Sequence, residues 1–184
     1  ELVVPRYYVY EDVPLRIDMQ GDSSLIAFDY ILDAGRTPIH SYCDLSIGLR
    51  HMPVADTTKY YIVQKAGKWR SSMGGKYANG WIKTRVRSLG TFSVDVDTIA
   101  PQITPIGQGG WRTSRNIRFR IKDMESGIGS YKVYIDGKFV LFGLKKGILV
   151  IQDPEKVKKG VPHKLEVTVT DQCGNMARKE IGRA

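Results

Sequence analysis

Hydrophobic and polar residues alternate with period two along most of this chain, and few segments repeat with the period of a helix. In the segment 165–170, the hydrophobic side of the alternation consists of Leu165, Val167 and Val169. The segment 117–122 behaves in the same way, with Ile117, Phe119 and Ile121 on one side and Arg118, Arg120 and Lys122 on the other. This pattern predicts β-strands that bury one face and expose the other.

The second half of the chain contains about seven such segments, near 102–106, 115–122, 130–136, 138–143, 147–152, 163–170 and 175–181. Glycine-containing turns separate them, and Asp136-Gly137 between two alternating runs predicts a type I′ hairpin, which needs positive φ. Seven strands in fewer than 90 residues are typical of an immunoglobulin-like sandwich. The stretch 153–160 is compatible with one helical turn or with a charged loop.

The first half also favours strands, near 13–19, 24–32, 42–50, 59–65, 79–87 and 90–96, with irregular stretches at 33–41 and 51–58. Between the halves, Pro101 restricts Ala100 to extended conformations and cannot donate to a sheet, so it suits an edge or first strand. The prediction is therefore an all-β fold of two tandem β-sandwich domains, residues 1–97 and residues 98–184, the second immunoglobulin-like.

The positive charge is concentrated in the second half. Residues 1–97 hold 12 Lys or Arg and 11 Asp or Glu, whereas residues 98–184 hold 16 and 8, so the net charges are +1 and +8. An excess of this kind favours an acidic partner such as an anionic glycan, a lipid head group or nucleic acid, although it is also typical of a solubilising surface. No stretch approaches ~18 apolar residues, so no membrane-spanning segment is expected.

The chain holds two cysteines, Cys43 and Cys173, one in each half, so two free thiols are expected rather than a bridge. It begins at Glu1 without Met or a signal peptide, which is typical of a mature product or an excised fragment.

Several stretches resemble proteins of the bacterial cell envelope. "VDTIAPQI", "DMESGIGSYKVYIDGKFVL" and "HKLEVTVTDQCGNMA" resemble an extracellular immunoglobulin-like module. Together with "PIHSYCDLSIGL" and "GGKYANGWIKTRVRSLGTFSVDVDTIAP", they are similar to the C-terminal non-catalytic region of Bacteroidetes-type M23 (lysostaphin-like) metallopeptidases. The resemblance covers nearly the whole chain. It implies a periplasmic or cell-surface setting and an upstream catalytic domain in the same polypeptide.

The zinc ligands of that peptidase family are absent from this chain. The family uses a His-x-x-x-Asp motif and a later His-x-His motif, whereas the three histidines here are His40, His51 and His163, and no His-x-His occurs. Catalytic zinc needs three convergent ligands. His40 and Asp44 have the His-x-x-x-Asp spacing, but they are expected on a strand, where residues four apart do not converge on one ion. No shared metal, cofactor or catalytic residue is therefore predicted.

Two groups of side chains are candidates for ligand binding. Trp69, Tyr77 and Trp81 surround a glycine-rich hairpin and could stack on sugar rings. The simpler interpretation is that Trp81 belongs to the core and Trp69 caps a sheet edge. Arg118, Arg120 and Lys122 form a basic stripe that could equally be an ordinary solvated sheet face. Asp171 is expected to organise a turn rather than to bind calcium with Asp123 and Glu125.

The sequence thus predicts a non-catalytic accessory region that positions an upstream peptidoglycan hydrolase. The expected partners are that catalytic domain and peptidoglycan or another anionic envelope glycan, with no nucleic acid and with the chain as a monomer. A free-standing extracellular glycan-binding or adhesion module is the alternative, and an enzyme with a new site in the first half is a third possibility.

Overall fold

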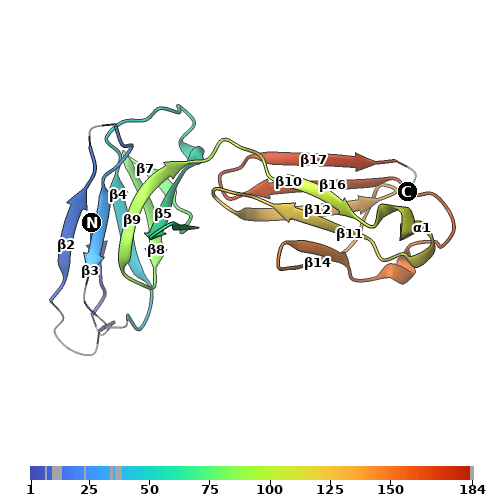
Figure 1. The fold of residues 1–184 in the computed structure, drawn as a ribbon, viewed down its shortest axis with the longest axis horizontal. Helices are drawn as coiled ribbons and strands as arrows, with labels where there is room; N and C mark the ends of the chain where they lie inside the picture. Colours follow the sequence, from blue (N-terminus) through green and yellow to red (C-terminus); the bar gives the residue numbers. More distant parts are fainter. Residues whose placement is uncertain (7, 10–13, 23, 34, 36–38, 183–184) are drawn as a thin grey trace. The chain divides into compact units, whose positions relative to one another are not determined.

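The computed structural model describes the chain apart from residues 7, 10–13, 23, 34, 36–38 and 183–184. It consists of two compact units, Glu1–Thr98 and Ile99–Ala184, which we call unit 1 and unit 2. Every sheet is antiparallel, so the all-β, sandwich-type fold predicted from the alternation is confirmed (Figure 1). The unit boundary follows Thr98, one residue after the boundary drawn from the sequence.

Unit 1 is built from a four-stranded and a five-stranded sheet. The first has the order β1-β4-β8-β7, with β1 (Leu2–Val3), β4 (Cys43–Gly48), β8 (Trp81–Val86) and β7 (Lys76–Ala78). The second has the order β2-β3-β9-β5-β6, with β2 (Arg16–Gln20), β3 (Asp29–Asp33), β9 (Gly90–Val96), β5 (Tyr60–Ala66) and β6 (Trp69–Ser72). A 3-10 turn at Thr57–Lys59, capped by the Asp56 side chain, leads into β5.

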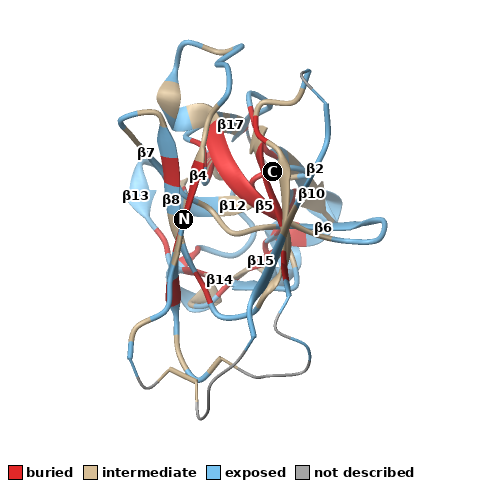
Figure 2. Ribbon diagram, turned by 90° about the vertical axis from the view of Figure 1, so that its left-hand side faces the viewer, coloured by how far each residue is buried: buried red, intermediate tan, exposed pale blue. Residues whose placement is uncertain are grey.

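The core of unit 1 is formed by side chains from both sheets, and Figure 2 colours the ribbon of buried residues red. Ile47 and Ile82 come from the first sheet, and Ile62 and Phe92 from the second. Tyr60 is also buried, and its hydroxyl donates to the Val54 carbonyl oxygen at 2.6 Å, so its polar atom is satisfied.

Unit 2 is built from two four-stranded sheets. One has the order β10-β11-β15-β14, with β10 (Gln102–Ile106), β11 (Arg118–Lys122), β15 (Ile148–Ile151) and β14 (Phe142–Lys145). The other has the order β13-β12-β16-β17, with β13 (Lys138–Phe139), β12 (Ile128–Ile135), β16 (Leu165–Asp171) and β17 (Met176–Ile181). Between β10 and β11 lie a 3-10 turn at Gln108–Gly110 and the helix α1 (Trp111–Ser114), and a 3-10 turn at Pro154–Lys156 follows β15.

Three aromatic rings fill the centre of unit 2. Phe119 is fully buried, and its ring centroid lies 5.2 Å from that of Trp111 in an edge-on arrangement and 5.9 Å from that of Phe142. Such pairs add to the free energy gained from burial alone. The Trp111 indole Nε1–H donates to the Ile106 carbonyl oxygen at 2.9 Å, so the helix carries a core side chain whose polar atom is also bonded.

Several expectations are confirmed residue by residue. Along β11 the exposed and buried positions alternate as predicted, and Ile117 before it is buried. Asp136 and Gly137 have φ of 51° and 76° and join Ile135 to Lys138, which fits the predicted hairpin. Pro101 precedes β10, which is an edge strand. Cys43 and Cys173 are both buried thiols, and they form no disulfide with each other.

Other expectations need correction. The short strands β1, β6 and β7 were not foreseen, and the predicted strand 138–143 is divided between β13 and β14. The simpler interpretation of Trp81 as a core residue is wrong, because its side chain is 42% exposed. Residue 13 of the predicted strand 13–19, and residues 34 and 36–38 of the irregular stretch 33–41, lie outside the described residues. No helix in the described part of the chain has the length and hydropathy to cross a membrane.

Replacing Phe119 by Ala should lower the free energy of unfolding of unit 2 by about 3–5 kcal/mol, because it leaves a cavity among three packed aromatic rings. Arg118→Ala, at the neighbouring exposed position, should change it by less than about 0.5 kcal/mol. Urea unfolding followed through the Trp111 indole NMR signal measures both. Equal effects of the two substitutions would mean that the inward and outward faces of β11 are assigned incorrectly.

Candidate functional site

The basic stripe predicted from the sequence lies on the outer face of β11. Arg118, Arg120 and Lys122 are all exposed, and successive outward positions on a strand are about 7 Å apart. Their cross-strand neighbours are uncharged, namely Gln102, Thr104 and Ile106 on β10 and Ile148 and Val150 on β15. None of the three cations forms an ion pair with another described residue. The stripe is therefore a solvated positive surface without compensating acids.

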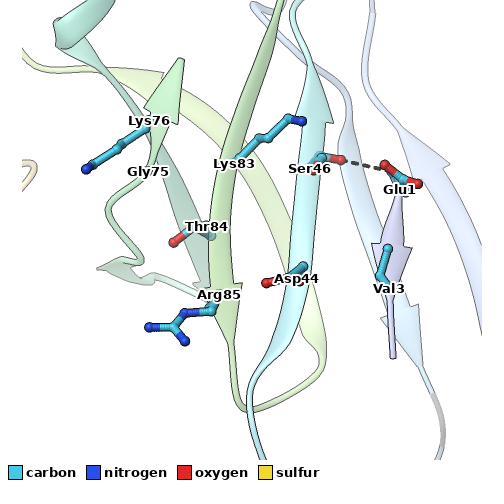
Figure 3. Close-up of a pocket in the computed structure, with 9 residues that line it drawn as sticks. All are labelled: Glu1, Val3, Asp44, Ser46, Gly75, Lys76, Lys83, Thr84 and Arg85. Atoms are coloured by element: carbon cyan, nitrogen blue, oxygen red, sulfur yellow. Dashed lines mark hydrogen bonds between the residues drawn. The ribbon is translucent and has the colours of Figure 1, made fainter. Parts of the chain in front are cut away.

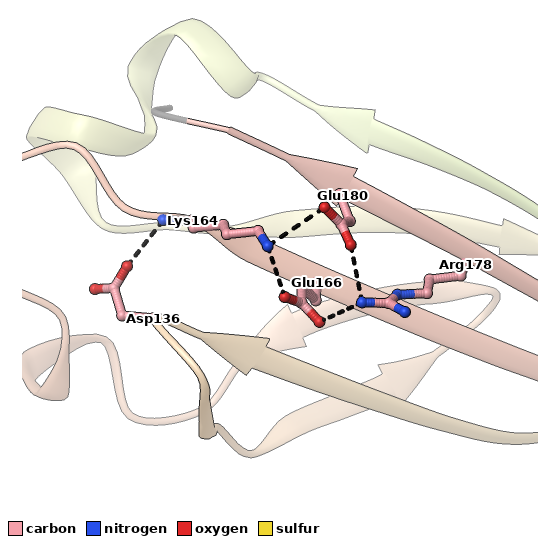
Figure 4. A network of polar contacts seen from close by, with 5 residues as sticks. All are labelled: Asp136, Lys164, Glu166, Arg178 and Glu180. Carbon is pink, nitrogen blue, oxygen red and sulfur yellow. Dashed lines mark hydrogen bonds and ion pairs between the residues drawn. The ribbon is translucent and has the colours of Figure 1, made fainter.

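The opposite sheet of unit 2 carries cations of a different kind. Lys164 just before β16 and Arg178 on β17 both bridge Glu166 and Glu180 in a closed network (Figure 4). The Arg178 guanidinium lies 2.9 Å from Glu166 and 2.8 Å from Glu180. Hydrogen bonds to these partners raise the pKa of Lys164, and the Lys164 ammonium lowers the pKa of Glu166. Positive charge here is neutralised locally, unlike the charge on β11.

The three aromatic candidates of unit 1 do not form one platform. Trp69 lies on β6 in the five-stranded sheet and is 72% exposed, with the Lys68 ammonium 6.0 Å from its ring centroid. Tyr77 on β7 pairs with the buried Ile82, whereas Trp81 pairs with Ala78, so Tyr77 and Trp81 belong to opposite faces of one sheet. Each aromatic residue would have to act separately.

A groove lies on the outer side of the β1-β4-β8-β7 sheet (Figure 3). Trp81 points to the same side of the sheet as Lys83, which lines the groove. The groove has a volume of about 650 Å³ and is lined by residues from all four strands and from the chain segments beside them. Its charged side chains are Glu1, Asp44, Lys76, Lys83 and Arg85. The segment 81–87 alternates Trp81, Lys83, Arg85 and Arg87 with Ile82, Thr84 and Val86, so the sequence carried a signal for this second basic strand that was missed.

His163 has a structural role in unit 2. His163 bridges two chain segments, with Nδ1 2.6 Å from the Asp136 carboxylate and Nε2 2.8 Å from the Lys158 carbonyl oxygen. The backbone N–H of His40 donates to the Tyr8 carbonyl oxygen, Asp44 points outward from β4, and His51 is exposed. Within the described residues, no group of three or more metal-ligating side chains includes a histidine.

Asp171 and Asp123 organise turns in unit 2. One Asp171 carboxylate oxygen accepts from the backbone N–H groups of Cys173 and Asn175, both at 2.8 Å. Asp123 accepts from those of Glu125 and Gly127 at 3.1 and 2.7 Å. The turn role predicted for Asp171 is thereby confirmed.

A family model described as a Zu5-like domain matches residues 1–97, which correspond to unit 1 except for its last residue. No curated protein matches the chain.

The His163 contacts predict a pH dependence for unit 2. The hydrogen bond to Asp136 and then that to Lys158 raise the pKa of His163 above 6.5. The hydrogen bond from His163 and then that from the Lys164 backbone N–H lower the pKa of Asp136 below 3.8. The stabilisation from the imidazolium is complete below pH 6.5 and is lost as the pH rises through the raised pKa of His163. The contribution of Asp136 is present above pH 3.8 and is lost as the pH falls through its lowered pKa.

An NMR titration checks this account directly. Asp136→Asn should bring the pKa of His163 back towards 6.5, while Asn still tolerates positive φ and can accept from the Lys164 N–H. The resonances of His51 serve as an internal reference, because His51 belongs to unit 1. A His163 pKa that is the same in both proteins would show that the carboxylate does not hold the imidazolium.

Proposed function

The chain belongs to the Zu5-like domain family through residues 1–97, and we propose that it is a non-catalytic accessory region of a cell-envelope peptidoglycan metallopeptidase. In this role it positions an upstream catalytic domain on its polymer, in the periplasm or at the cell surface. The family description names a domain and no activity. The proposal therefore rests on the charge and the faces of the sheets and on the resemblance of the patterned segments to M23 accessory regions.

The observation that carries the proposal is the uncompensated stripe on β11. Arg118, Arg120 and Lys122 face solvent in one row. Arg118 and Arg120 have uncharged cross-strand neighbours on both sides, and Lys122 has the uncharged Gln102 on β10. A row of this kind suits a polymer that repeats its negative charges along its length. Fully solvated contacts are weak individually and are screened over about 10 Å at 0.1 M salt, so they favour reversible retention on a surface.

The placement of the histidines supports a binding role rather than hydrolysis. His163 links two segments of unit 2, because its two ring nitrogens contact the Asp136 carboxylate and the Lys158 carbonyl oxygen. His40 and Asp44, which have the spacing of one zinc motif, belong to no group of three or more metal-ligating side chains in the described structure. Metal-assisted hydrolysis needs such a convergent set, so the proposal assigns the chemistry to an upstream domain.

The groove beside Trp81 favours the alternative, a free-standing extracellular glycan-binding or adhesion module. The two roles differ in whether the polypeptide also carries a catalytic domain. An accessory region should increase hydrolysis of intact sacculi by an attached catalytic domain without changing hydrolysis of a short soluble peptide. An adhesion module should retain whole cells or glycan without any attached hydrolase.

Reversing the stripe with Arg118→Glu, Arg120→Glu and Lys122→Glu should weaken pelleting of the chain with purified peptidoglycan sacculi by about tenfold or more at low salt. The binding of the original protein should also fall steeply as ionic strength rises. Co-sedimentation at a series of salt concentrations measures both effects.

A matched control reverses three other exposed cations of unit 2, namely Lys138, Lys158 and Lys159. Circular dichroism should show both triple variants folded, because all six side chains are exposed. Equal loss of binding in the two variants would show that binding depends on net charge alone and not on the position of the stripe. Binding that is insensitive to salt would refute the electrostatic role of β11.

A further inference from the structure

The groove on the outer face of the β1-β4-β8-β7 sheet separates its charges into two sides. Lys76, Lys83 and Arg85 come from β7 and β8, whereas Glu1 and Asp44 come from the chain start before β1 and from β4 (Figure 3). The groove therefore presents cations on one side and carboxylates on the other, with a net charge of one positive unit among these side chains. A ligand that fits it must combine an anionic group with hydrogen-bond donors.

The cations of the groove are not neutralised by the described part of the chain. Lys76 and Lys83 are direct cross-strand partners, an arrangement that is unfavourable for like charges. Figure 3 shows their side chains turned in opposite directions, Lys83 towards Ser46. Arg85 is the cross-strand partner of Asp44 but forms no ion pair with any described residue, and its guanidinium lies 5.7 Å from the ring centroid of Tyr42. An anion placed in the groove would compensate the positive charge of these side chains.

Trp81 adds an aromatic surface on the same face, two residues before Lys83 on β8. A Cβ atom at Gly48 would lie 3.6 Å from three carbons of the Trp81 ring, so the indole rests against the glycine backbone. The side chain is nevertheless 42% exposed. Trp81 also lines a smaller cavity of about 160 Å³, which shares Glu1 and Ser46 with the groove. The glycine thus supports a fixed, half-exposed indole beside the charged groove.

We propose that this groove binds a sugar residue that carries a single carboxylate. The apolar face of a pyranose ring packs on the Trp81 indole, the carboxylate pairs with Lys83 and Arg85, and sugar hydroxyls donate to Asp44. The acids on the far side repel a chain of phosphates, so the groove differs in selectivity from the stripe on β11. The choice of a glycan as ligand rests on the proposed function, whereas the position of the site rests on the groove itself.

NMR titration of the whole chain with two soluble disaccharides tests this assignment. The acidic probe is N-acetylglucosaminyl-N-acetylmuramic acid with a free lactyl carboxylate, and the neutral probe of matched size is di-N-acetylchitobiose. The acidic sugar should bind about tenfold more tightly and shift the Trp81 indole signal. Arg85→Gln should raise the Kd for the acidic sugar by about tenfold and leave that for the neutral sugar unchanged.

Lys68→Gln is the matched control, because it also removes one exposed charge from unit 1 but lies outside the groove. It should leave both affinities unchanged. Trp81→Ala should weaken both sugars, and circular dichroism establishes that the variant is folded. Equal affinity for the two sugars, unchanged affinity after Arg85→Gln, or no Trp81 shift at millimolar sugar would each overturn the proposal.

The outcome is distinguishable from that of the proposed function. Reversal of Arg118, Arg120 and Lys122 should leave the disaccharide titration unchanged, because those residues belong to unit 2. If sacculi fail to bind while the disaccharide binds in the groove, the accessory role fails and the sugar site stands. If sacculi bind but the disaccharide does not, the sugar site fails alone.

Discussion

The strict alternation of side chains along each antiparallel strand is the constraint on which this structure depends. A strand that supplies Phe119 and Ile121 to the core must present Arg118, Arg120 and Lys122 to solvent, because successive side chains point to opposite faces. The same rule places Lys83 and Arg85 outward on β8, where Ile82 and Val86 are buried. Core residues therefore determine which side chains can form a binding surface. Whether an outer face is active in binding then depends on its cross-strand neighbours.

The two sheets of unit 2 show how much those neighbours matter. On β16 and β17, Glu166 and Glu180 are cross-strand partners, and Lys164 just before β16 and Arg178 on β17 each bridge both acids in a closed network. On β11 the neighbouring positions hold amide, hydroxyl and aliphatic side chains, so the charge remains available to a partner. A net charge of +8 in residues 98–184 does not distinguish these two faces, whereas strand pairing does. The same comparison applies to unit 1, where Lys76 and Lys83 are cross-strand partners and neither forms an ion pair with another described residue.

The sequence predicted the strands where the alternation was long and the turn chemistry was specific. β11, β16 and the hairpin at Asp136-Gly137 are of this kind, and their inward and outward residues are as expected. The sequence could not predict β1 or β7, which have two and three residues and are defined only by pairing with β4 and β8. The environment of Trp81 was missed for a related reason. Trp81 pairs with Gly48 and Ala78, and both of these residues are too small to cover its side chain. Gly48 is also far from Trp81 in the sequence, so the sequence did not reveal that pairing.

The central claim is that the outward residues of β11 and β8 are the surfaces that meet envelope glycan. The most direct test is a map of backbone amide shifts in the whole chain, recorded while peptidoglycan fragments solubilised with a muramidase are added. The account predicts that the largest changes fall on β11 and β8 and that the strands β16 and β17, with their neutralised network, change little. Changes concentrated on β16 and β17, or spread evenly over the chain, would contradict it.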